Sequence, residues 1–85
     1  MPLTVHYGRD VPTGLFVDVE RTFRAFSCVA HVETIVNLDH IRVLVYIKPN
    51  TVREERYAIY DAQWEIMGRW PDEGLAFALR LEGQE

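Results

Sequence analysis

The chain is poor in cysteine, has no long apolar run and has no cluster of basic residues. A single cysteine among 85 residues excludes an intrachain disulfide. Together with an N-terminus that lacks a basic segment followed by an apolar one, it predicts a reducing, cytoplasmic setting. No apolar run approaches the ~18 residues of a membrane span, so no membrane partner is expected.

Positive charge is also scarce. Nine Lys and Arg residues stand against thirteen Asp and Glu residues, which gives a net charge of −4 with both signs scattered along the chain. Proteins that bind nucleic acid need clustered positive charge, because phosphate contacts dominate their affinity. Nucleic acid is therefore not expected as a partner.

The length and the apolar content predict one domain over residues 1–85. The sequence is 48% hydrophobic, and a chain of this size buries only about 60–65% of its unfolded surface. Such a core is marginal, and no disulfide can reinforce it. We therefore expect a homo-oligomer, most simply a dimer, or a complex with another protein.

Prolines and glycines are few, four and five, and they divide the chain into short segments. Apolar and polar residues alternate over 3–7, 31–37, 41–47 and 75–81, as in half-buried strands, and recur at helical spacing over about 14–28 and 52–69. A short polar turn at 37–40 indicates a hairpin. The resulting βαββαβ order predicts a ferredoxin-like α+β two-layer sandwich, with a four-stranded antiparallel sheet in the order 4-1-3-2 and both helices on one face. Whether the first, short strand joins the sheet stays open.

The segment TVRE, residues 51–54, has the pattern of a helix capping box. In that motif the Thr51 hydroxyl accepts a hydrogen bond from a free backbone N–H, and Glu54 reaches back to the Thr51 amide. The pattern predicts that the second helix begins at Val52.

The same helix contains the segment YAIYDAQWEIMGRW, which is rich in aromatic residues. A sheet-facing stripe is expected from Val52, Ile59, Ala62, Ile66 and Trp70. Tyr57, Tyr60 and Trp64 form a second sector, with Met67 between the two, so the apolar arc is about 220° wide where one packed face needs little more than 100°. We interpret Tyr57, Tyr60, Trp64 and Met67 as an interface with a partner chain. The alternatives are the rim of the core and an aromatic cage for a cation.

Alternation along the strands assigns a second set of residues to the outer face of the sheet. Its chemically active members are His6, His31, Arg42, Tyr46 and Arg80, which are candidates for binding a small anionic ligand. A solvated face with cross-strand charge pairs such as Glu33 with Arg42, or a dimer contact, would account for the same pattern.

No complete catalytic or metal-binding constellation is present. His31 and Glu33 share a face but lack a third ligand, and Cys28 has the context of a small buried hydrophobe. There is no nucleophile elbow, phosphate loop, dinucleotide fingerprint or calcium loop. The sequence predicts no metal, no cofactor and no catalytic residue.

The segment GRDVPTGLF, residues 8–16, resembles the Asp-Arg-Pro-Gly-Leu turn of ACT-type regulatory domains, through Asp10, Pro12, Gly14 and Leu15. Val11 stands in place of the arginine, and Thr13 is inserted before the glycine. The resemblance implies a βαββαβ module that binds an amino acid at a dimer interface.

These observations favour a small module without catalytic activity that acts by self-association or by binding another protein. The alternatives are an ACT-like sensor of a small molecule, and a small dimeric enzyme with a pocket on the outer face of the sheet.

Overall fold

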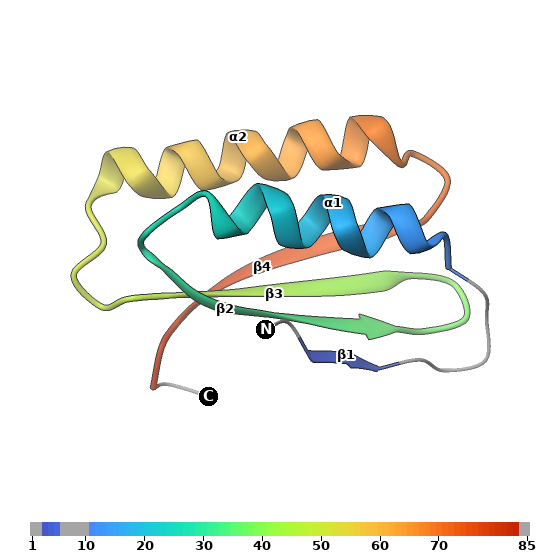
Figure 1. Cartoon of the computed structure of the whole chain (residues 1–85), viewed down its shortest axis with the longest axis horizontal. Helices are drawn as coiled ribbons and strands as arrows, with labels where there is room; N and C mark the ends of the chain where they lie inside the picture. Colours follow the sequence, from blue (N-terminus) through green and yellow to red (C-terminus); the bar gives the residue numbers. More distant parts are fainter. Residues whose placement is uncertain (1–2, 6–10, 84–85) are drawn as a thin grey trace.

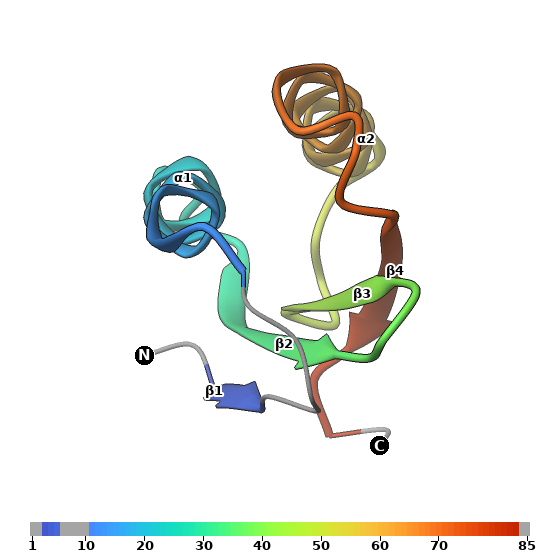
Figure 2. The same ribbon diagram turned by 90° about the vertical axis from the view of Figure 1, so that its right-hand side faces the viewer.

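The computed structural model describes residues 3–5 and 11–83 of the chain. Its elements are β1 (Leu3–Val5), α1 (Thr13–Arg24), β2 (Val29–Val36), β3 (Ile41–Ile47), α2 (Arg53–Arg69) and β4 (Leu75–Leu81). Both helices lie on the same side of the sheet, α1 toward β1 and β2 and α2 toward β3 and β4 (Figures 1 and 2). Neither described helix is long and apolar enough to cross a membrane.

The strands follow one another across the sheet in the order β1-β2-β3-β4. β1 is parallel to β2, β2 is antiparallel to β3, and β3 is parallel to β4. The central pair is the predicted hairpin, closed where the Asn37 amide donates to the His40 carbonyl at 2.8 Å. The molecule is therefore two strand–helix–strand units joined by a hairpin, an α+β arrangement with a mixed sheet.

The predicted ferredoxin-like sandwich is wrong. Its order 4-1-3-2 would place β1 in the centre of an antiparallel sheet, whereas β1 lies at the edge beside β2 and pairs with it in parallel. The physical reason is that alternation places residues on the two faces of a strand but does not determine which strands pair. Each helix instead returns the chain to the position next to the strand it left. The fold implied by the resemblance to ACT-type domains fails with the same finding.

The boundaries of the elements also differ from those predicted. α1 ends at Arg24 rather than near residue 28, and Cys28 lies in the turns that lead into β2. β1 is described over Leu3–Val5, and whether it extends to residue 7, as predicted, lies outside the described residues. The predicted capping box is not formed. Val52 occupies the N-cap position of α2 and its side chain makes no capping bond, while the Thr51 hydroxyl donates to the Lys48 carbonyl at 2.6 Å.

The core lies between the helices and the sheet. α1 contributes Leu15, Val19 and Phe23, and the Phe23 ring lies 6.1 Å from that of Phe77 on β4. β3 is buried along both faces except at Arg42. A strand with so few polar residues is typical of a central position, which is where the sheet places it.

Candidate functional site

The side of α2 that faces away from the sheet is aromatic. Tyr57 is 58% exposed, Tyr60 is 42% exposed and Trp64 is 71% exposed, while Met67 is half-buried. These four residues, which we call the α2 aromatic face, follow one another at intervals of three, four and three positions. That spacing gives one continuous stripe along a helix, as in the contact seam of a coiled coil.

The opposite side of α2 is the one that packs on the sheet, through Ile59, Ala62, Gln63 and Ile66. The three rings lie roughly 120–180° around the helix from Ile66. Tyr60, the least exposed of them, lines a hollow with Leu79 and Leu81 of β4, as a residue at the rim of the core would, whereas Tyr57 and Trp64 are more exposed. Two expected members of the packed stripe lie outside the helix. Val52 precedes it and is exposed, whereas Trp70 follows its end and, partly buried, packs against the core as expected.

Charged residues of both signs flank the aromatic face. Arg53, Glu54 and Arg56 are exposed in the N-terminal half, and Asp61, Glu65 and Arg69 are exposed in the C-terminal half. Arg69 pairs with Asp18, and Glu65 acts electrostatically on the same guanidinium. Among the described residues, no ion pair is formed by Arg53, Arg56 or Asp61.

The outer face of the sheet brings together three of the predicted ligand-binding residues. His31 on β2 is in register with Tyr46 on β3, and Tyr46 is in register with Arg80 on β4. The His31 and Tyr46 rings are stacked, with centroids 4.2 Å apart, and Tyr46 is only 4% exposed. The three side chains thus form a row across the sheet, although the phenol that was expected to face a ligand is buried.

The other two predicted residues do not join this row. Arg42 lies opposite Ile35 and Ala76, four positions along β3 from Tyr46, which is about 13 Å in a strand. His6 lies outside the described residues. Glu33 faces Leu44 rather than Arg42, so the predicted cross-strand charge pair is not formed.

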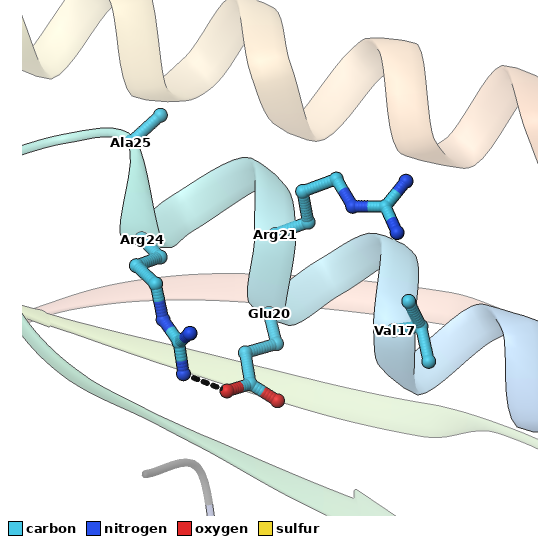
Figure 3. A pocket seen from close by; sticks show the side chains of 5 residues that line it. All are labelled: Val17, Glu20, Arg21, Arg24 and Ala25. Carbon is cyan, nitrogen blue, oxygen red and sulfur yellow. Dashed lines mark hydrogen bonds and ion pairs between the residues drawn. The ribbon is translucent and has the colours of Figure 1, made fainter.

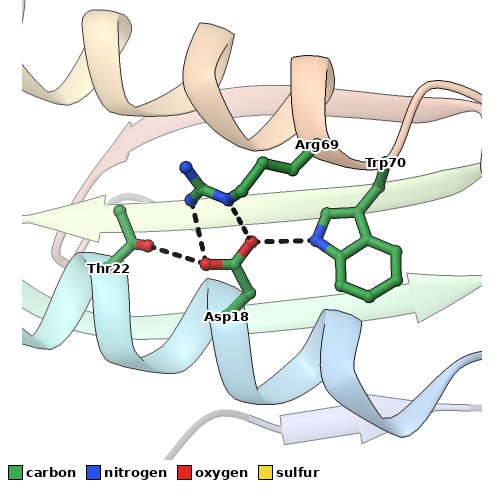
Figure 4. Close-up of polar contacts among 4 residues, drawn as sticks. All are labelled: Asp18, Thr22, Arg69 and Trp70. Atoms are coloured by element: carbon green, nitrogen blue, oxygen red, sulfur yellow. Dashed lines mark hydrogen bonds and ion pairs between the residues drawn. The ribbon is translucent and has the colours of Figure 1, made fainter.

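A polar cluster that the sequence did not indicate joins the two helices (Figure 4). Asp18 on α1 accepts hydrogen bonds from Arg69 Nε and Nη2, at 2.8 and 2.9 Å, and from Trp70 Nε1 at 2.8 Å. Thr22 donates a longer bond of 3.4 Å to the same carboxylate. The bonds from Arg69 lower the pKa of Asp18, although partial burial opposes them. All four residues are occupied with one another, so the cluster links α1 to α2 and offers no free chemical group.

A broad hollow lies on the exposed side of α1 (Figure 3). It measures about 470 Å³, and its described lining residues come from α1 and from Ala25, the residue that follows it. Glu20 and Arg24 neutralise each other across it, and Val17 is the only large apolar side chain. The hollow is a helix surface without convergent groups from a second element.

Cys28 is a buried free thiol. Burial raises the pKa of this thiol, and the neighbouring Glu55 carboxylate raises it further, so it stays protonated and a weak nucleophile near neutral pH. Within residues 3–5 and 11–83, no group of three His, Cys, Asp or Glu side chains is arranged to hold a metal.

No protein-family model, curated protein or solved structure matches this chain.

Proposed function

We propose that this protein is a self-association module, in which the α2 aromatic face of one copy packs against the same face of a second copy. The observation that carries the proposal is the exposure of Tyr57, Tyr60 and Trp64 in one stripe. Three such rings expose on the order of 300 Å² of apolar surface, as much as the largest patch on a typical monomer. Exposed surface of this kind is costly in water and marks an interaction site.

The charges beside the stripe favour a second copy as the occupant. In an antiparallel arrangement related by a two-fold axis, Arg53 and Arg56 of each copy lie near Asp61 and Glu65 of the other. One helix from each chain makes a small interface, so we expect a dimer that dissociates on dilution.

The first test is the oligomeric state measured by sedimentation over a range of concentrations. The wild type should shift from monomer to dimer as concentration rises, and its thermal midpoint should rise in parallel, because association stabilises the folded state by mass action. Trp64→Ala should shift the transition at least tenfold toward higher concentration. Val17→Ala, an exposed apolar residue on α1, is the matched control and should leave association unchanged.

The second test asks whether the two α2 faces meet. A variant with Asp61→Arg and Glu65→Arg has a positive face, and one with Arg53→Glu and Arg56→Glu has a negative face. Each should stay monomeric alone through like-charge repulsion, and the two should associate when mixed. Two variants that each dimerise like the wild type would show that the contact lies elsewhere and would overturn the proposal.

We also propose that the protein works in the cytoplasm. Its single cysteine is buried with its thiol free, which suits a reducing compartment.

A further inference from the structure

β4 forms an open edge of the sheet (Figure 2). One side of it pairs with β3 in parallel, and no strand pairs with its other side among residues 3–5 and 11–83. The Gly74 carbonyl and the Glu82 amide both bond to β3, so the backbone groups of the even-numbered residues point to that strand. The backbone groups of the odd-numbered residues therefore point to the free edge.

The free edge carries little of what normally keeps sheet edges apart. Edge strands are usually protected by charged side chains, a proline or a bulge. β4 has the sequence LAFALRL, in which Arg80 is the one charged residue, and its pairing with β3 is regular along the whole strand. Its helix-facing side chains are only partly buried, whereas the corresponding residues of β3 are all buried. The edge is thus both unpaired and apolar, and such an edge is a template for another strand.

The α2 aromatic face lies on the same side of the molecule as this edge. Around the helix, Tyr60 is about 100° to one side of the buried Ile59, and Arg69 is about 80° to the other side. Arg69 pairs with Asp18, so its flank of the helix faces α1. Tyr60 lines a hollow with Leu79, so the aromatic flank lies on the side of β4. The exposed rings and the free edge therefore adjoin each other.

We propose that β4 pairs with β4 of a second copy, antiparallel and about the same two-fold axis that relates the two α2 aromatic faces. The pairing rests on the proposed self-association, to which it adds a second contact. It joins the two four-stranded sheets into one continuous sheet, with the helices of both copies on the same face.

The spacing of the elements fits this arrangement. α2 lies over β3 and β4 (Figure 2), and neighbouring strands are about 4.8 Å apart. Two copies joined along β4 therefore bring their α2 axes to about 10 Å from each other, a distance at which helices pack. The rings alone supply on the order of 300 Å² per copy, whereas a stable complex needs about 800 Å² per partner. Pairing along the whole of β4 supplies part of the difference.

The register of the pairing follows from the length of the strand. Full overlap of the two strands places Ala78, the central residue, on the two-fold axis opposite the partner's Ala78. Phe77 then lies opposite the partner's Leu79 in a hydrogen-bonded pair, because the backbone groups of both point to the edge. On the other face of the sheet, Ala76 lies opposite the partner's Arg80, and the small side chain leaves room for the arginine.

Amide hydrogen exchange of the full chain, measured residue by residue below and above the dimer transition, tests the pairing. The amides of Phe77 and Leu79 point to the free edge, so they should exchange quickly in the monomer and at least tenfold more slowly in the dimer. The Ala78 amide points to β3 and is the control within the same strand, which should be protected already in the monomer. A dimer in which Phe77 and Leu79 exchange as they do in the monomer overturns the strand pairing and leaves the contact between the α2 aromatic faces standing. A chain that stays monomeric throughout overturns both proposals.

Charge substitutions on the outer face of the sheet test the register. Ala78→Glu sets two like charges against each other at the axis, so it should move the dimer transition about fivefold toward higher concentration while keeping the far-ultraviolet circular dichroism of the wild type. Ala78→Arg should do the same, and a mixture of the two variants should associate at least as strongly as the wild type. Ala76→Glu is the matched control, because its carboxylate meets the partner's Arg80 and should not weaken association. If both variants of Ala78 dimerise like the wild type, β4 does not lie at the axis and the proposal is overturned.

Discussion

The two helices pack on the same side of one sheet, but their outer surfaces differ in kind. α1 buries Leu15, Val19 and Phe23, and Val17 is the one large apolar side chain that it exposes. α2 buries Ile59 and Ile66 in the same way, but its outer surface carries the α2 aromatic face.

The two helices together show which of their apolar residues the packing of the sheet requires. α1 packs on its part of the sheet through one buried stripe, Leu15, Val19 and Phe23, with the partly buried Phe16 beside it. On α2, by contrast, Tyr57 and Trp64 are 58% and 71% exposed, so the packing of the core does not account for them. This is the physical reason for assigning them to an interaction with another molecule.

The largest expected effect is a difference in folding stability between substitutions on the two sides of α2. Ile66→Ala should lower the free energy of unfolding by about 2–5 kcal/mol, because it removes buried methyl groups and leaves a cavity. Trp64→Ala should change the stability of the dissociated monomer by only about 0.5 kcal/mol. Urea denaturation at a concentration below the dimer transition measures both. Equal losses would place Trp64 in the core and remove the difference between the two sides.

The next effect concerns the link between the helices. Asp18→Asn removes the charge that accepts from Arg69 and Trp70, and we expect a loss of about 1 kcal/mol, because the exposure of Arg69 screens the ion pair. Glu20→Gln is the matched control on α1, since its partner Arg24 is largely exposed, and it should have almost no effect. If both variants denature alike, the cluster of Figure 4 adds nothing to the packing of α1 on α2.

The same carboxylate predicts a dependence on pH. The folded-state pKa of Asp18 is lowered, chiefly by Arg69, from a value of about 4 in the unfolded chain. Its contribution is therefore fully present above that unfolded value, and it is lost as the pH falls toward and through the lowered pKa. The difference in unfolding free energy between the wild type and Asp18→Asn should be constant from pH 6 to 8 and shrink below about pH 4. A difference that grows on acidification would contradict the lowered pKa.

Local pattern predicted the elements better than their arrangement. Alternation located β4 at residues 75–81, and helical spacing located α2 to within one residue. The order of the strands depends on which strands pair with each other, and the alternation of apolar and polar residues carries no information about that pairing. The useful signal was β3, whose single polar residue Arg42 indicates a strand buried on both faces.

The candidate sites differ in the same way, since local pattern indicates some of them and only the tertiary structure shows the others. The exposed rings of α2 follow from spacing within one helix, so the sequence could indicate them. The link from Asp18 to Arg69 and Trp70 joins residues more than fifty positions apart, so it requires the tertiary structure.

The smallest effect is a gain in stability at the start of α2. Val52 occupies the N-cap position in an extended conformation, its carbonyl accepts from the Arg56 amide at 3.2 Å, and its side chain is exposed and makes no capping bond. The first-turn amides of Glu54 and Glu55 are those that a capping side chain would satisfy. Val52→Ser should therefore stabilise the fold by about 0.5–1 kcal/mol, which raises the thermal midpoint by a few degrees. Val52→Ala shortens the side chain without adding an acceptor and should bring no gain. Because residue 52 lies off the α2 aromatic face, the serine variant should dimerise as the wild type does, and a gain shared by both variants would show that the hydroxyl does not cap the helix.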